Sequence, residues 1–261
     1  MWQQLEVKDD TKLTRDPVLI VSVSTSNPQF QLLYSQAREL ANFLLEKKGG
    51  FKLLASLYSS ALPALVNISE NGVAELPSCN FYLHTSGQRD IVLFAGYSSP
   101  TGDEYEFADA VLSFAKKLGV KELVSVGARW TENPLSPLET PKVQGFSSDL
   151  EGADWIKNNG AVLLRDETAL YFTNVIVALA PRYGMRGTKL SVDHGEPRPH
   201  PKSLMAILTV LTKKIGIMVD TSSLENQSIE LAAAIKAGGG FGEEGEDNVQ
   251  PSNKEQRNIY R

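Results

Sequence analysis

The stretch around His194 is the first place where side chains suited to metal binding gather. Asp193, His194, Gly195 and Glu196 are consecutive, and His200 follows between two prolines. These histidines lack the spacing of a helical metal site, and no second cluster of histidine or cysteine accompanies them. The stiff, proline-rich stretch favours a hydrogen-bonded loop near a strand end, and we expect neither a metal ion nor a cofactor.

Cys79 and His84 could form a nucleophile and its base. Cys79 is the only cysteine of the chain and lies five residues before His84. Their closeness in sequence says little, because catalytic pairs are neighbours in space. A lone cysteine is more often a small buried apolar residue, and no Gly-x-Ser-x-Gly nucleophile motif occurs. We expect no catalytic residue and predict that the protein is not an enzyme.

The hydroxyl-rich run Ser22–Ser26 could meet an anion at the start of the helix that follows it. It lacks the glycine spacing of a phosphate-binding loop, and helix capping explains these residues equally well. One alternative stays open, a small-molecule or nucleotide-binding enzyme of carboxylate-ligase or nucleoside-phosphorylase-like class. In that case Ser24, Asn27 and Asp193 would bind the ligand at the carboxyl ends of the strands.

Composition and charge exclude several classes of partner. The chain has 261 residues, 42% of them hydrophobic, which is typical of a globular protein. The net charge of −5 without a clustered basic face argues against nucleic-acid binding. No apolar run resembles a signal peptide or is long enough to cross a bilayer. A single cysteine cannot form an intramolecular disulfide, which favours a reducing compartment, and we expect a cytoplasmic protein. The absence of a long apolar run predicts that the membrane is not a partner.

The first half of the chain alternates predicted strands and helices. Its hydrophobic periodicity is that of an α/β protein with a mixed, mostly parallel sheet. The predicted strands are Pro17–Thr25, Phe51–Tyr58, Phe81–His84, Ile91–Tyr97 and Glu122–Gly127, and the predicted helices run from Ser26 to Gly49 and from Tyr105 to Gly119. The third and fourth strands should form a hairpin. The fourth and fifth should be parallel neighbours joined by a helical crossover.

The second half begins with a stretch that cannot be regular helix or central strand. Trp130–Pro141 contains three prolines and is predicted to be a surface loop. A helix over Thr168–Leu179, a short strand over Lys189–Val192, and helices over Leu204–Ile215 and Leu224–Ala237 should follow.

The last 24 residues differ sharply in composition from the rest. Gly238–Gly242 is glycine-rich, and Glu243–Arg261 has almost no apolar residues except Val249, Ile259 and Tyr260. Such a segment should be disordered when free. An apolar residue followed by tyrosine gives no folding benefit at the end of a disordered tail.

The ending Ile259-Tyr260-Arg261 resembles the hydrophobic–tyrosine–any-residue ending of proteasome activators. There the tail enters a pocket between neighbouring α-subunits of the proteasome core particle. The resemblance implies that the terminal carboxylate of Arg261 pairs with a lysine of the partner, that Tyr260 fills a pocket, and that Ile259 is buried. Several tails on one oligomer would bind more tightly than one. We therefore expect a homo-oligomer facing a ring.

The folded part is similar to the proteasome assembly chaperone family in its archaeal or bacterial form, as a homologue of the second assembly chaperone. The likeness covers roughly residues 15–236. It lies in the opening strand Pro17–Thr25 and in the stretch from Gly96 to Gly127, with Gly-Tyr-Ser-Ser-Pro, Glu-Phe-Ala-Asp-Ala, Leu-Gly-Val and Val-Gly-Ala. It also lies in Pro-Lys-Ser-Leu-Met-Ala-Ile-Leu from Pro201. It implies a three-layer α/β sandwich related to nucleoside phosphorylase-like folds, and a non-enzymatic assembly chaperone or activator.

The expected domain organisation has three parts. Residues 1–14 form an N-terminal extension, residues 15–237 the α/β domain, and residues 238–261 a flexible tail with the docking motif at its end.

Overall fold

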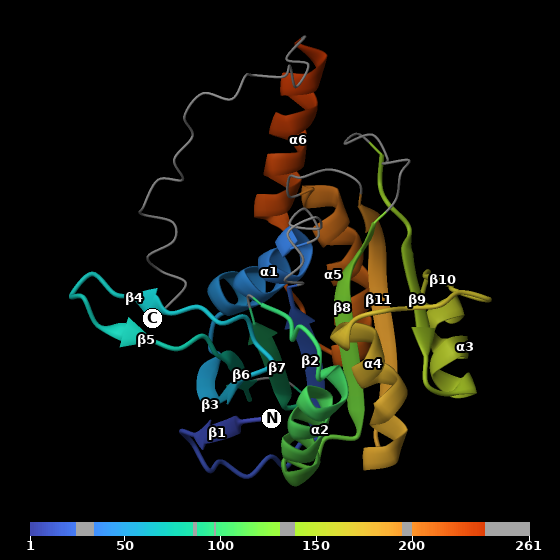
Figure 1. Ribbon diagram of the computed structural model, residues 1–261. Coiled ribbons are helices and arrows are strands. Elements are labelled where there is room, and N and C mark those ends of the chain that lie inside the picture. The colour runs from blue at the N-terminus through green and yellow to red at the C-terminus, as the bar shows by residue number, and fades with distance from the viewer. Residues whose placement is uncertain (25–33, 86–87, 97, 131–138, 195–199, 238–261) are drawn as a thin grey trace.

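The fold is built on one nine-stranded sheet, seen in a computed structural model that describes residues 1–24, 34–85, 88–96, 98–130, 139–194 and 200–237 (Figure 1). In spatial order its strands are β1 (Gln3–Val7), β3 (Lys52–Ser59), β6 (Cys79–His84), β7 (Ile91–Gly96), β2 (Val18–Val23), β8 (Glu122–Trp130), β11 (Arg186–His194), β9 (Val143–Ser147) and β10 (Val162–Leu163). The four central strands, β7, β2, β8 and β11, are parallel to one another, and antiparallel pairs flank them. The predicted mixed α/β sheet is confirmed.

β2 lies at the centre because it can be buried on both faces. All six of its residues are buried, and five of them are Val, Leu or Ile. The predicted hairpin of β6 and β7 is present, with Phe81 opposite Phe94. β7 and β8 were expected to be neighbours, but β2 lies between them and pairs with both. A strand this apolar is most stable with a partner on each edge and helices on each face.

Helices cover both faces of the sheet and complete the predicted three layers (Figure 1). α2 (Glu104–Lys117) and α4 (Phe172–Leu179) pack on one face with Phe81, Phe94 and Leu123. On the other face, α1 (Tyr34–Phe43), α3 (Leu150–Asn158) and α5 (Pro201–Ile215) pack with Ile20 and Leu93. Short π-helical and 3-10 turns extend α1 over Leu44–Lys48 and α4 over Ala180–Tyr183.

Several element boundaries differ from those predicted. β8 and β11 each have nine residues and pair along their whole length, so both are longer than expected. β9 was not expected, and residues 131–138 of the predicted loop lie outside the described residues. α4 begins at Phe172 rather than Thr168, because Tyr171 has a φ of 75°, which is incompatible with a right-handed helix.

Three features lie at the periphery of the sheet. β1, within residues 1–14, pairs antiparallel with β3 as an edge strand. β4 (Asn67–Ile68) and β5 (Ala74–Glu75) form a separate two-stranded sheet that projects from the body, and α6 (Ser222–Lys236) extends away from the sheet (Figure 1). Within the described part of the chain, no helix combines the length and apolarity needed to cross a membrane.

Candidate functional site

The predicted docking residues Ile259, Tyr260 and Arg261 lie outside the described residues, which end at Ala237. The last described element is α6, and Leu224 near its start is buried against α5 and the core. Further along α6 most residues are exposed, and Ile229 has 67% of its surface exposed. The far end of α6 therefore lies away from the sheet (Figure 1).

The carboxyl edge of the parallel strands holds two of the three residues named for the enzyme alternative. Ser24 follows β2, and Asp193 is near the end of β11. β8 lies between these strands, so the two residues are not neighbours, and Asn27 lies outside the described residues. Both carboxylate oxygens of Asp193 are engaged: Arg129 Nε donates to Oδ1 at 2.8 Å, and Gln144 Nε2 donates to Oδ2 at 2.5 Å. Asp193 thus joins β8, β9 and β11.

The histidine stretch is only partly described. The side chain of His194 and all of Gly195 and Glu196 lie outside the described part. His200 caps α5, because its Nδ1 accepts a hydrogen bond from the Ser203 amide at 3.3 Å. Among the residues that are described, no three His, Cys, Asp or Glu side chains form a group that could hold a metal ion.

Cys79 and His84 lie on the same strand but on opposite faces of the sheet. Cys79 belongs to the core beneath α2 and α4, whereas His84 stacks on Phe51, which packs on the other core. Cys79 is buried, and burial raises the pKa of its thiol to about 12. Because the thiolate is the nucleophilic form, this environment leaves Cys79 chemically inert.

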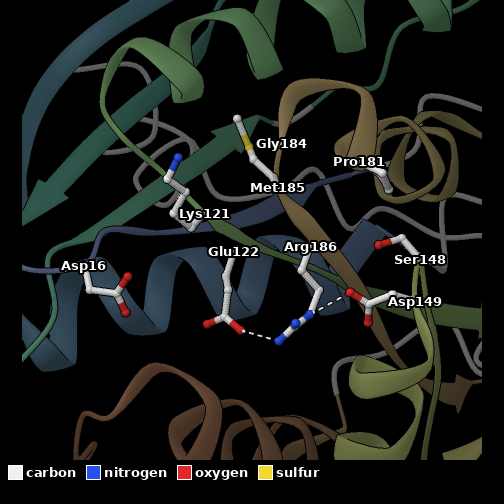
Figure 2. A pocket seen from close by; sticks show the side chains of 9 residues that line it. All are labelled: Asp16, Lys121, Glu122, Ser148, Asp149, Pro181, Gly184, Met185 and Arg186. Carbon is white, nitrogen blue, oxygen red and sulfur yellow. Dashed lines mark hydrogen bonds and ion pairs between the residues drawn. The ribbon is translucent and has the colours of Figure 1, made fainter.

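A charged hollow at the amino edge of the parallel strands was not found from the sequence (Figure 2). It has a volume of about 510 Å³ and is lined by Asp16, Lys121, Glu122, Ser148, Asp149, Pro181, Gly184, Met185 and Arg186. Glu122 begins β8, and Arg186 begins β11 beside it. The signal that could have located it is the presence of opposite charges at the starts of two adjacent strands.

Ion pairs connect the charged residues of this hollow. Arg186 Nε is 2.7 Å from Asp149 Oδ2, and another guanidinium nitrogen of Arg186 is 3.8 Å from Glu122 Oε1 (Figure 2). Arg186 also pairs with Glu151. Glu122 accepts from Arg89 at 2.7 Å and from Lys214 at 3.0 Å. Burial alone would raise the pKa of Glu122, but the hydrogen bonds from Arg89 and Lys214 outweigh it, so its pKa lies below the usual value.

Four charged residues of the hollow, Asp16, Glu122, Asp149 and Arg186, are therefore held in ion pairs. The carboxylate of Glu122 joins the β6–β7 loop, through Arg89, to α5, through Lys214. The arrangement is suited to holding the layers in register, since an ion that is already hydrogen-bonded gains little from a ligand.

Lys189 has a buried side chain, and its burial was not predicted from the sequence. It lies in β11 with 5% of its surface exposed and points toward the face covered by α4. Its Nζ is 3.4 Å from Ser125 Oγ, and Ser125 itself donates to the backbone carbonyl of Thr173 at 2.7 Å. Burial lowers the pKa of Lys189 to about 7. No carboxylate among the described residues pairs with it.

A family model identifies the relatives of this fold. The model of the PAC2 family matches residues 35–237, from α1 to the end of α6. The chain belongs to the PAC2 family. The match spans the two helical layers and all of the sheet except β1 and β2. A comparison with curated proteins finds no match to this PAC2 protein.

Solved structures share its fold. PbaB from Pyrococcus furiosus, an archaeal proteasome activator, aligns with a TM-score of 0.75 and 19% identity, over 90% of this chain and 98% of that chain. PbaA from the same organism, an archaeal homologue of proteasome-assembly chaperone, aligns with a TM-score of 0.66 and 19% identity, over 88% and 92%. A proteasome-assembly chaperone homologue from Mycobacterium tuberculosis aligns with a TM-score of 0.69 and 18% identity, over 88% and 97%.

Proposed function

We propose that this PAC2 protein is a non-enzymatic proteasome-binding protein, an assembly chaperone or activator, which inserts its C-terminal tail into α-ring pockets of the proteasome core particle. The ending Ile259-Tyr260-Arg261 on a PAC2 fold carries the proposal. The likeness to an archaeal proteasome activator over 98% of that chain supports it. The protein acts in the cytoplasm as a homo-oligomer.

Each residue of the ending has a separate role in this proposal. The terminal carboxylate of Arg261 pairs with a lysine in the pocket, while Tyr260 buries its ring and hydrogen-bonds through its hydroxyl. Ile259 adds an apolar contact. A single tail binds weakly because ordering it costs conformational entropy, so affinity depends on several tails binding one ring.

The position of α6 supports tail docking. α6 extends from the body and is mostly exposed beyond Leu224 (Figure 1). The sequence predicts a disordered tail, and a random coil with the length of residues 242–261 reaches about 25 Å. A helix that starts the tail away from the sheet keeps the folded body from blocking the approach to a ring.

The proposal is tested by binding the full-length protein to an archaeal core particle and measuring both affinity and peptide hydrolysis. Tyr260→Ala and deletion of residues 259–261 should each weaken binding by about tenfold or more, because a pocket-filling aromatic residue typically contributes a few kcal/mol. Tyr105→Ala is the matched control, since Tyr105 is a tyrosine of α2 with 65% of its surface exposed. Equal binding by the deletion variant and the unchanged protein would refute tail docking.

A further inference from the structure

We propose that Lys189 is a site of reversible modification by carbon dioxide, and that the carbamate formed on its side chain caps the first turn of α4. The carbamate carries a negative charge at a place where the unmodified side chain carries a positive charge when protonated. This inference is independent of tail docking, because Lys189 lies in the core of the folded body.

The place of Lys189 in the fold is unfavourable for a cation. Its side chain lies in β11 beneath α4, and only 5% of the residue surface is exposed (Figure 1). No carboxylate among the described residues pairs with its Nζ, and the hydrogen bond from Nζ to Ser125 Oγ is 3.4 Å long. An ammonium group buried without an opposite charge loses its hydration and receives little in exchange.

The start of α4 adds to this mismatch. Ser125 Oγ, which Lys189 contacts, also donates to the carbonyl of Thr173 at 2.7 Å, and Thr173 is the second residue of α4. The amide groups at the start of a helix favour negative over positive charge. The side chain of Tyr171 does not cap α4, and the amides of Phe172 and Thr173 have no acceptor in the part of the chain that the structure describes. An anion beside this turn would supply one.

The sheet surface next to the Nζ has no large side chain. Lys189 pairs with Ser125, and the next pair on the same face toward the carboxyl edge is Gly127 with Ser191. A Cβ atom on Gly127 would lie 3.2 Å from Lys189 Nζ, so the lysine leans over this glycine toward the carboxyl edge. α4 leads through Ala180–Tyr183 to the start of β11, so its own first turn faces the same edge. The added group would therefore lie on the side to which the α4 amides point.

Burial also determines which reagent can react. A side chain this buried is closed to large electrophiles, whereas carbon dioxide is small and uncharged and enters apolar surroundings. Carbon dioxide reacts with the neutral amine, and burial lowers the pKa of Lys189 to about 7, so about half of these amines are neutral at neutral pH. An exposed lysine is neutral in only about one molecule in several thousand at this pH. Lys189 should therefore react in preference to the exposed lysines.

The reaction needs no reactant besides carbon dioxide. The lone pair of the neutral Nζ forms a nitrogen–carbon bond to carbon dioxide, one carbon–oxygen π pair moves onto oxygen, and one proton leaves the nitrogen for water. The product is a carbamate with one negative charge, and protonation of the nitrogen reverses the reaction. Its two oxygens can accept hydrogen bonds from the amides of Phe172 and Thr173, which replaces an unfavourable cation by an anion that α4 stabilises.

The test records carbon-13 NMR spectra of the full-length protein in labelled bicarbonate, which supplies carbon dioxide, near neutral pH. The folded protein should show a carbamate resonance of the α-amino group and a second one from Lys189. The second resonance should be lost in Lys189→Met and in the unchanged protein unfolded in urea, where this lysine has its ordinary pKa. Lys117→Met, at an exposed position in α2, is the matched control and should keep both resonances.

Urea unfolding provides a second measurement and shows that Lys189→Met is folded. Carbon dioxide is varied at constant pH and ionic strength. A concentration ten times the half-saturating value should lower the unfolding equilibrium constant of the unchanged protein about tenfold, because the folded state alone holds the modified side chain. The stability of Lys189→Met should not respond to carbon dioxide.

Two spectra would overturn the inference. One is a spectrum of the folded, unchanged protein that contains the α-amino carbamate alone. The other is a second carbamate resonance that persists in Lys189→Met, since it would then belong to another lysine. Stabilisation by bicarbonate without a second carbamate resonance would indicate non-covalent binding of the anion, and the inference would fail in that case as well.

Discussion

Replacement of Lys189 by methionine should stabilise the fold, and the gain should depend on pH. The ammonium group of Lys189 is buried, and its hydrogen bond to Ser125 Oγ is 3.4 Å long. Methionine has a similar length and no polar atom that requires a partner. Ser125 keeps its hydrogen bond to Thr173 at 2.7 Å in the variant, so no buried hydroxyl is left unpaired.

The magnitude follows from the lowered pKa of Lys189. Its pKa falls from the usual 10.5 to about 7, so the folded state binds this proton more weakly than the unfolded state. Each unit of pKa is worth about 1.4 kcal/mol, which gives a cost on the order of 5 kcal/mol when the group is fully protonated in both states. The cost is complete below pH 7 and decreases as pH rises toward 10.5. Between pH 7 and pH 9 the free energy of unfolding should therefore rise by about 2 kcal/mol through this group.

Urea unfolding at pH 7 and pH 9 measures both effects. Lys189→Met should be more stable than the unchanged protein at pH 7, and the difference should shrink by about 2 kcal/mol at pH 9. Lys117→Met, at an exposed position near the end of α2, serves as the control and should change stability by less than about 0.5 kcal/mol. A Lys189→Met variant that is less stable than the unchanged protein, or a difference that is equal at both pH values, would show that the buried ammonium carries no such cost.

Two further predictions concern the amino-edge hollow and the lone cysteine. Glu122→Gln should lower the free energy of unfolding at pH 7 by about 2 kcal/mol, because Arg89 and Lys214 lose their shared carboxylate. The pKa of Glu122 is lower in the folded than in the unfolded state, so its carboxylate stabilises the fold above the unfolded pKa, and this stabilisation is lost as pH falls. At acidic pH, urea unfolding should therefore give the same free energy of unfolding for Glu122→Gln and the unchanged protein. Cys79, with a thiol pKa of about 12, should resist a disulfide reagent at pH 8 in the native state and react completely in guanidinium, and rapid native reaction would contradict its burial.

The elements that the sequence predicts well are those with a strong local pattern. Val18–Val23 is recognisable because a short run rich in β-branched and aliphatic residues is typical of a strand buried on both faces. α2 is recognisable because Phe107, Val111 and Leu112 recur at helical spacing. β9 lacks this pattern, since Val143 and Gly145 are its only buried residues and Gln144 and Ser147 are polar.

The elements missed depend on contacts distant in sequence. Nothing in residues 91–130 indicates that β2 inserts between β7 and β8, because that order is decided by the burial of β2. Likewise, Lys189 lies in the alternating run Thr188–Val192, where nothing local distinguishes it from an exposed lysine of an edge strand. Only the packing of α4 over β11 shows that it is buried.

The candidate docking residues could be proposed from sequence because their signal is local and does not depend on contacts distant in sequence. The ending Ile259-Tyr260-Arg261 is conspicuous against a polar segment, so composition alone identifies it. The exposure of Leu65, Val66 and Ile68 is harder to recognise, because these residues resemble any short strand until the fold leaves them exposed. Sequence therefore reveals candidate sites that stand out by composition more readily than those that depend on the fold.

These features assign separate tasks to separate parts of the chain. In the proposed scheme the ending of the tail determines which pocket is bound, and α6 determines where the tail begins. The strength of multivalent binding depends on the number and reach of the tails as well as on the affinity of each tail. A three-residue motif that binds weakly alone is therefore sufficient when an oligomer presents several tails within reach of one ring.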